Sequence, residues 1–282
     1  MQKVEMTRII AHRGARSLAP ENTLAAAQKG FEAGAWAWET DVTITRDRQL
    51  VLFHDPTLER TTNVRTVFPK RTSCRISHFN AREILGLDAG SYFIKTDPFG
   101  QIRQGSVRPE EFADFGSARV PTVAQGLAMT RQAGWRINLE LKRWDEGTIL
   151  QDHPDGSVED LIPSLVLETI ERSGIDPASV MISSFYHPWL LEIEQAAPHM
   201  AVQALMEEMT VLEKCLADDH FQTFNVSLDL ARPDLIQKLK ARRKQINIWT
   251  VNDEADVRRL IQAGVDGIIT DFPQQFATQN AW

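Results

Sequence analysis

The sequence predicts an α/β protein whose architecture is most simply a TIM-type (β/α)8 barrel. Short apolar runs alternate with amphipathic stretches along most of the chain, and this is the pattern of parallel strands joined by crossover helices. The length of 282 residues exceeds the about 250 residues that such a barrel typically needs. Polar residues suited to chemistry follow several apolar runs, at the strand ends where a barrel builds its active site.

The expected strands and helices follow one another in a regular order. A strand at residues 8–11 precedes a helix at residues 21–33, and Gly34 follows where a glycine can take the positive φ of a helix end. Apolar residues then alternate at Trp36 and Trp38 and at Val42 and Ile44, and residues 50–53 form a further run. Later strands are expected at residues 136–141, 180–185, 200–205, 224–228, 246–251 and 267–270, and later helices at residues 161–172, 189–195, 233–240 and 253–263.

Residues 56–119 interrupt this rhythm. The segment is rich in Arg, Thr, Gly, Phe and Pro and has no regular period. Without these roughly 64 residues the chain would have about 218, close to a minimal barrel. We expect one catalytic domain spanning residues 1–282, in which residues 56–119 are an insertion after the second strand region that forms a small cap over the strand ends.

Composition and charge exclude several classes of protein. The formal net charge of −7 gives no sign of a nucleic-acid-binding surface. Cys74 and Cys215 lie far apart without CxxC spacing, which argues against a zinc or redox motif. No apolar run approaches the ~20 residues of a membrane span, and the first six residues lack the apolar segment of a secretory signal. We therefore expect a cytoplasmic protein without stable membrane insertion.

Three acidic residues are the candidate ligands of a cation. Glu39 and Asp41 are two residues apart, so both share one face of an extended segment, and Glu140 lies between Leu139 and Leu141. Carboxylates that converge at a barrel rim repel one another unless a cation lies among them, and an all-oxygen set suits Mg²⁺ or Ca²⁺ better than zinc. Structural ion pairs are the alternative, because a buried carboxylate can also be paired with a lysine.

Two histidines and two cations complete the candidate site. His12 and His54 each follow an apolar run, and imidazoles titrate near working pH, which suits general acid and base catalysis. Arg13 and Lys142 would supply positive charge for an anionic phosphate. His12 could instead be a core histidine, and Asp55 could orient His54 or merely cap a turn.

The ordered set of motifs resembles the glycerophosphodiester phosphodiesterase family, in its cytosolic type, over nearly the whole chain. These motifs are His12-Arg13-Gly14, Pro20-Glu21-Asn22-Thr23, Glu39-Thr40-Asp41-Val42, His54-Asp55 with Leu58-Glu59-Arg60-Thr61-Thr62, Leu87-Asp88-Ala89-Gly90-Ser91, Val120-Pro121-Thr122, Glu140-Leu141-Lys142, Trp249-Thr250-Val251-Asn252 and residues 264–273. The Gly-Ala-Asp often found before the acidic pair is Gly34-Ala35-Trp36 here, which leaves the acidic pair itself unchanged.

The resemblance implies a TIM-type barrel that hydrolyses glycerophosphodiesters, such as glycerophosphocholine or glycerophosphoethanolamine, to sn-glycerol 3-phosphate and an alcohol with the help of a divalent metal ion. The implied roles are metal ligation by Glu39, Asp41 and Glu140, acid–base catalysis by His12 and His54, phosphate contact by Arg13 and Lys142, and a glycerol pocket lined by Trp249. Trp249 could alternatively serve only barrel packing.

Several questions stay open at the level of sequence. The aromatic residues of the insertion, namely Phe68, Phe79, Tyr92, Phe93 and Phe99, could form a channel for an acyl chain, so that a lysophospholipase D-like or sphingomyelinase D-like phosphodiesterase is the alternative. A non-catalytic phosphate-binding barrel is a third hypothesis. The headgroup, the native metal, the oligomeric state, the roles of the two histidines, and the choice between water attack and a cyclic phosphate are not determined by sequence.

Overall fold

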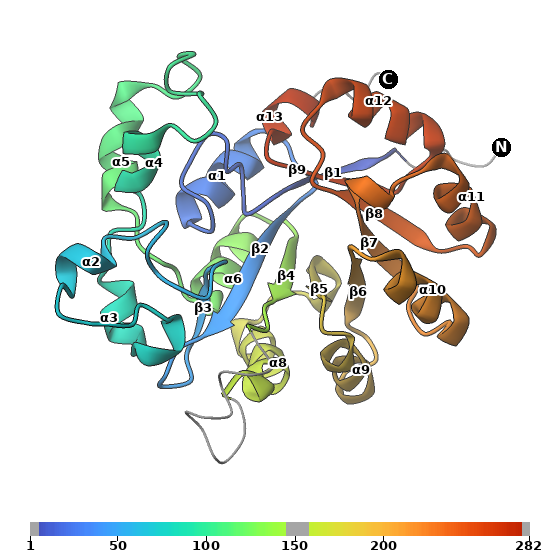
Figure 1. The fold of residues 1–282 in the computed structure, drawn as a ribbon, viewed down its shortest axis with the longest axis horizontal. Helices are drawn as coiled ribbons and strands as arrows, with labels where there is room; N and C mark the ends of the chain where they lie inside the picture. Colours follow the sequence, from blue (N-terminus) through green and yellow to red (C-terminus); the bar gives the residue numbers. More distant parts are fainter. Residues whose placement is uncertain (1–5, 145–157, 278–282) are drawn as a thin grey trace.

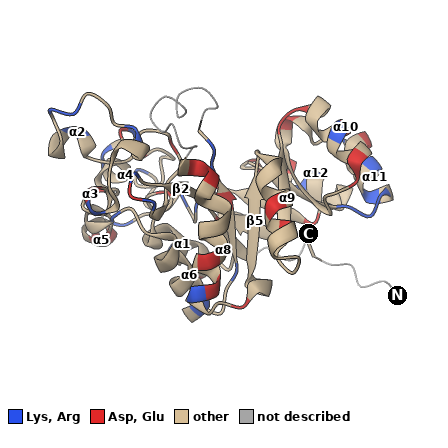
Figure 2. Ribbon diagram, turned by 90° about the horizontal axis from the view of Figure 1, so that it is seen from below, with Lys and Arg blue, Asp and Glu red and all other residues tan. Residues whose placement is uncertain are grey.

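A computed structural model describes residues 6–144 and 158–277 of the chain (Figure 1). The first five residues, which contributed to the argument against a secretory signal, lie outside the described residues. Within the described ranges, no helix combines the length and the apolar character needed to cross a membrane. Figure 2 shows Lys and Arg interspersed with Asp and Glu on the helices.

Eight parallel strands of the described residues close into a barrel, as predicted. They are β1 (Arg8–Ala11), β2 (Ala37–Ile44), β4 (Ile137–Leu141), β5 (Val180–Ser184), β6 (Ala201–Met206), β7 (Thr223–Ser227), β8 (Gln245–Trp249) and β9 (Gly267–Thr270). Neighbouring strands pair in chain order, and the pairings of β1 with both β9 and β2 close the ring. The run at residues 50–53 forms β3 (Leu50–Leu52), which returns antiparallel along the end of β2 and is not a barrel strand.

Alternation along β2 divides its side chains between two environments. Trp38 belongs to the hydrophobic core between barrel and helices, where it stacks on Trp135 at 6.4 Å between ring centroids. Its indole N–H donates to Thr130 Oγ1 at 2.9 Å. Glu39 and Asp41, one residue out of phase with Trp38, therefore project to the barrel interior, as their spacing predicted.

Helices cover the outside of the barrel between successive strands (Figure 1). They are α1 (Leu24–Glu32), α6 (Val123–Gln132), α8 (Ile162–Ser173), α9 (His187–Ala196), α10 (Met209–Asp218), α11 (Pro233–Ala241), α12 (Glu254–Ala263) and the short α13 (Pro273–Phe276). Helix α1 begins three residues later than predicted, because Thr23 is its N-cap and accepts a hydrogen bond from the Ala26 N–H at 3.2 Å. Helices α6, α10 and α13 lie outside the helical ranges that the sequence predicted.

Residues 56–119 contain four short helices, α2 (Val64–Val67), α3 (Ala81–Leu85), α4 (Ser91–Thr96) and α5 (Phe112–Ser117). Figures 1 and 2 both show them gathered at one side of the barrel, and Figure 1 shows them near β3 and α1. Part of the segment shares a small core with Val51 and Phe53, which includes Phe79. Phe93 and Phe115 form a second core with Ala26 of α1. The aromatic rings of the segment thus stabilise its own attachment to the barrel.

Candidate active site

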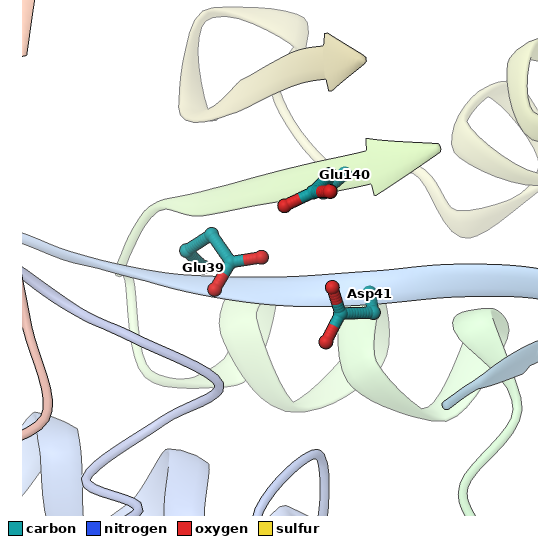
Figure 3. A group of neighbouring side chains, drawn as sticks. All are labelled: Glu39, Asp41 and Glu140. Atoms are coloured by element: carbon teal, nitrogen blue, oxygen red, sulfur yellow. The ribbon is translucent and has the colours of Figure 1, made fainter. Parts of the chain in front are cut away.

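Three acidic side chains converge inside the carboxyl end of the barrel (Figure 3). Glu39 and Asp41 come from β2, and Glu140 comes from β4, where it is the direct register partner of Asp41. One carboxylate oxygen of each residue lies within 4.8 Å of the others. All three residues are buried. Strand register therefore brings together carboxylates that lie about a hundred residues apart in the chain.

The loop after β1 positions Glu39 through its backbone. The Arg13 N–H donates to Glu39 Oε2 at 2.9 Å. The turn that allows this depends on Gly14, whose φ is +77° and where a Cβ would lie 2.4 Å from the carbonyl carbon of Ala26. Only glycine fits such a close approach of the loop to α1 without strain.

A second turn, just before α1, positions Asp41. The side chain of Asn22 donates to Asp41 Oδ2 at 2.8 Å, while its own oxygen accepts from the Asp41 N–H at 3.1 Å and from Thr40 Oγ1 at 2.7 Å. Asn22 itself has a positive φ of 56°, a conformation that asparagine tolerates better than most residues. The Pro20–Thr23 motif therefore holds β2 in place through Asn22, in addition to starting helix α1.

Two cationic side chains contact the acidic cluster. Arg13 Nε lies 3.2 Å from Asp41 Oδ2, and Lys142 Nζ lies 2.9 Å from Asp41 Oδ1 and also contacts Glu140. Burial would raise the pKa of Asp41, but Lys142 and Arg13 hold it well below its usual range. Burial together with Asp41 and Glu140 raises the pKa of Glu39 well above its usual value.

The residues present fit a bound divalent cation. Three carboxylates and two cations leave the ionised cluster with one excess negative charge. The Oε1 atom of Glu39 is buried and accepts no hydrogen bond from any residue that the structure describes. A divalent cation would convert the cluster to one excess positive charge, which a singly charged phosphodiester would neutralise. An all-oxygen ligand set is what Mg²⁺ and Ca²⁺ prefer.

His12 and His54 each pair with a carboxylate through Nδ1. The Nδ1 atom of His12 lies 2.6 Å from Asp271 Oδ1, and that of His54 lies 2.6 Å from Asp55 Oδ1. Burial, opposed by Asp271, lowers the pKa of His12 to about 4. An ionised carboxylate can only accept, so each pair favours the Nδ1–H tautomer and leaves Nε2 as the second ring nitrogen.

A network of ion pairs joins the partner of His54 to Arg13. Arg60, from the inserted segment, donates to Asp55 Oδ2 at 2.6 Å and to Glu21 Oε2 at 2.9 Å. Glu21 in turn accepts from Arg13 Nη1 at 2.8 Å. Burial of Glu21 opposes its ionisation, but the hydrogen bonds of Arg60 and the charge of Arg13 lower its pKa to about 2. The inserted segment thus contributes to the positioning of both the histidine and the arginine.

One open cavity of about 770 Å³ connects these groups. Its lining includes His12, Arg13, His54, Glu140, Lys142, Arg143, Trp144, Phe185, Tyr186 and Trp249. Trp249 is held at the rim because its indole N–H donates to the Asn225 carbonyl at 2.9 Å, and Phe185 packs edge-on against it at 5.5 Å. Six of the eight predicted site residues line this cavity. Asp41 contacts two of them, Arg13 and Lys142, and Glu39 lines a small second chamber that shares His12, Glu140 and Trp249 with the cavity.

Sequence reasoning missed Asp271 and Arg60 as individual residues of the site. Asp271 follows the last strand just as His12 follows the first, so the position of a polar residue after a strand was the available signal. Arg60 lies in the segment without periodicity, and its place in the motif that follows His54-Asp55 was the available signal. Asp55 is both a partner of His54 and an ion-pair partner of Arg60, which answers the question that its sequence position left open.

Comparison with known proteins shows what this chain is similar to. A family model described as the glycerophosphoryl diester phosphodiesterase family matches residues 12–275. A glycerophosphodiester phosphodiesterase of Caldanaerobacter subterraneus is 32% identical over 275 residues, covering 95% of both chains. The structure of a putative glycerophosphoryl diester phosphodiesterase from Silicibacter pomeroyi superimposes with a TM-score of 0.79 at 25% identity, covering 99% of this chain and 94% of that one. An Oleispira antarctica phosphodiesterase solved with the product sn-glycerol-3-phosphate has the same fold, with a TM-score of 0.74 at 24% identity, covering 96% of this chain and 95% of that one.

Proposed function

The chain belongs to the glycerophosphoryl diester phosphodiesterase family, and from this premise we propose that it is a metal-dependent enzyme that hydrolyses glycerophosphodiesters to sn-glycerol 3-phosphate and an alcohol. The observation that carries the proposal is the acidic cluster of Glu39, Asp41 and Glu140 beside two carboxylate-paired imidazoles at one cavity. The glycerophosphodiesterase activity itself follows from the family; the metal, the substrates and the roles of the residues are our proposal.

Glu39, Asp41 and Glu140 would hold the cation, which we propose to be Mg²⁺ or Ca²⁺. When bound, such an ion acts as a Lewis acid toward a phosphoryl oxygen. Arg13 and Lys142 line the cavity, each beside a different oxygen of Asp41, and would supply fixed positive charge where charge develops on the phosphoryl group. Trp249 offers an apolar face for the glycerol carbons.

In this proposal, His12 and His54 carry out the proton transfers of the reaction. Hydrolysis forms a bond from the nucleophile oxygen to phosphorus and breaks the bond from phosphorus to the alcohol oxygen. One histidine accepts the proton of the nucleophile through Nε2, and the other donates a proton from Nε2 to the departing alkoxide. Each transfer contributes a factor of roughly 10²–10⁴ to the rate. Burial lowers the pKa of His12 and so favours its neutral form at pH 7, the form in which Nε2 carries a free lone pair.

The test is a product assay with glycerophosphocholine and glycerophosphoethanolamine. Release of glycerol 3-phosphate should cease in EDTA, return with Mg²⁺ or Ca²⁺, and fall by at least about 100-fold in His12→Ala and in His54→Ala. His199→Ala is the matched control, because His199 is exposed and lies outside the cavity lining. Full turnover in EDTA would refute the metal proposal, and wild-type turnover in either active-site variant would refute its assigned role.

We also propose that residues 1–282 work as one catalytic domain, in which residues 56–119 are an inserted cap-like segment that also positions residues of the site. The hydrogen bonds of Arg60 to Asp55 and Glu21 support this, as does the Tyr92 hydroxyl, which accepts the Glu21 N–H at 3.1 Å. The cytoplasmic location stays a prediction from the sequence.

A second candidate is a lysophospholipase D-like reaction, in which the substrate keeps one acyl chain. Phe79 and Phe93 of the inserted segment are almost completely buried, so they do not form the predicted channel. An apolar groove of about 540 Å³ instead lies between α9 and α10 and shares Phe185 with the catalytic cavity. Leu191 and Val211 line it with 41% and 39% of their surface exposed.

In this candidate reaction, the acyl chain of the substrate would extend from the glycerol end of the cavity, past Phe185, into this groove. If so, lysophosphatidylcholine should be cleaved faster than glycerophosphocholine, and Leu191→Asp should slow only the former. Cleavage of glycerophosphocholine alone, or equal loss with both substrates, would remove the second candidate and leave the first unaffected.

A further inference from the structure

A buried acidic residue outside the cation cluster contacts His12. Asp271 directly follows β9, and its strand neighbour β1 leads directly into His12, so closure of the barrel brings the two residues together. His12 Nδ1 lies 2.6 Å from Asp271 Oδ1, and the side chain of Asp271 is only 7% exposed. The two residues are separated by 259 positions in the chain.

Asp271 is itself fixed by the loop after β8. The side chain of Asn252 donates to Asp271 Oδ2 at 2.8 Å, and its oxygen accepts the Asp271 backbone N–H at 3.0 Å. Arg16 Nε lies 3.4 Å from Asp271 Oδ1. Both carboxylate oxygens are therefore engaged, and the carboxylate cannot turn away from His12 without breaking these contacts.

Aromatic residues pack next to Asp271 on the side of the inserted segment. The guanidinium of Arg16 lies over the ring of Phe99, 5.1 Å from its centroid. Phe99 packs edge-on against Phe272 at 5.6 Å, next to Asp271 in the chain. A hydrogen bond in such a partly dry environment holds its geometry better than one open to water, because solvent competes less for its donor and acceptor.

This arrangement decides which ring nitrogen of His12 serves the reaction. The carboxylate of Asp271 is an acceptor only while it is ionised, so the proton on this side of the ring belongs to Nδ1. Burial opposes ionisation of Asp271, but the adjacent His12 and Arg16 lower its pKa to about 2, which agrees with an acceptor role. Nε2 then carries the lone pair when the ring is neutral and the second proton when the ring is charged.

We propose that Asp271, clamped by Asn252, is a positioning residue that fixes the Nδ1–H tautomer and orientation of His12 and so makes Nε2 the proton-transfer atom. This inference rests on the proposed function, because it assumes that His12 transfers a proton. Asp271 itself touches no reacting atom. His54 has a comparable partner in its chain neighbour Asp55, whereas the partner of His12 exists only through barrel closure.

The decisive experiment combines Asp271→Asn with His12→Ala. Asp271→Asn keeps the size of the side chain but removes the obligatory acceptor, so kcat for glycerophosphocholine should fall by about 10²–10⁴-fold with KM changed less than about threefold. Because Asp271 acts through His12, the double variant should be no slower than His12→Ala alone. Asp266→Asn is the matched control: Asp266 accepts the Ile246 N–H at 2.8 Å at the amino end of β9, and kcat should not change.

A second measurement does not depend on turnover. Nitrogen-15 NMR of the imidazole should show the Nδ1–H tautomer of His12 in the wild type and a mixture of tautomers in Asp271→Asn. Asn252→Ala should show an intermediate tautomer ratio and an intermediate kcat, and it serves if Asp271→Asn does not fold.

Each outcome bears on the inference. Wild-type kcat in Asp271→Asn, multiplied losses in the double variant, or an Nε2–H tautomer in the wild type would overturn it. Wild-type turnover in His12→Ala would instead refute the role of His12 in the proposed function, even if the tautomer is as expected.

Discussion

Replacement of Lys142 by methionine is a sharp test of how the acidic cluster is stabilised. Lys142 is buried, with 8% of its surface exposed, and its ammonium contacts both Asp41 and Glu140. Loss of one partner from a buried ion pair typically destabilises a protein by about 3–5 kcal/mol, because the remaining charge stays buried. At roughly 2–4 °C per kcal/mol for a chain of this size, Tm in EDTA should fall by roughly 6–20 °C.

Added Mg²⁺ should restore part of this loss. A cation that binds only the folded state contributes about 2.7 kcal/mol at a concentration 100 times its Kd. Without the Lys142 ammonium, Asp41 and Glu140 have less positive charge near them. Mg²⁺ should therefore raise the Tm of the variant more than it raises that of the wild type. Even with saturating Mg²⁺, kcat should stay about 10²–10³-fold lower if Lys142 contacts the phosphoryl group as proposed, because that fixed positive charge is then lost.

Lys244→Met is the matched control for this prediction. Lys244 is buried to a similar degree, with 4% exposed, and its ammonium contacts the Phe221 carbonyl at 2.8 Å and Asp219 at 2.7 Å. The side chain of Asp219 is 69% exposed, so water can solvate it when the lysine is lost. Thermal unfolding followed by circular dichroism, with EDTA or Mg²⁺, compares the two. A Tm of Lys142→Met within 2 °C of the wild type in EDTA, or an equal response of both variants to Mg²⁺, would refute the reasoning.

Three further predictions concern other parts of the site. Gly14→Ala should lower the free energy of unfolding by more than about 3 kcal/mol, because the added Cβ would clash with Ala26. At Gly34, where φ is also positive at +79° but an added Cβ would meet no atom within 4 Å, the same substitution should cost about 1–2 kcal/mol. Equal Tm shifts of the two variants would contradict this. Glu21→Gln should make the free energy of unfolding depend less on pH in acid. The lowered pKa of Glu21 stabilises the wild type above about pH 4.5, and this stabilisation is lost as the pH falls toward 2. If urea unfolding shows the same pH dependence for both proteins from pH 5 to 2, the reasoning is wrong. Trp249→Ala should lower kcat/KM for glycerophosphocholine by about 10–100-fold, mainly through KM, if its ring contacts the glycerol carbons, and an unchanged KM would show that it serves packing alone.

Much of the barrel could be predicted because its signals are local. Strand runs, helix periods and the glycine after α1 each depend on residues within a few positions of one another. The shared face of Glu39 and Asp41 follows from the two-residue period of a strand alone. The start of α1 was misplaced because Asn22 and Thr23 have both helix-compatible and turn-forming chemistry. Asn22 is held in the turn by its hydrogen bonds with Thr40 and Asp41 of β2, and Thr23 caps the helix.

The antiparallel β3 and the missed α10 show a second limit. Residues 50–52 read as a strand in either direction, and only pairing with β2 showed that the chain turns back instead of continuing the barrel. Helix α10 has Thr, Val and Cys in its sequence, which weaken its local helical signal, so packing of Leu212 and Leu216 against the core decides its conformation.

The amino-acid sequence alone determined the fold class, the family and the residue types of the site, since each depends on patterns along the chain. Only the tertiary structure decided that Asp41 and Glu140 are register partners, that Lys142 lies between them, and that Asp271 meets His12. The physical reason is that barrel closure joins strands from opposite ends of the chain. Which polar groups then share one buried space depends on strand register and distance, quantities that no local pattern encodes.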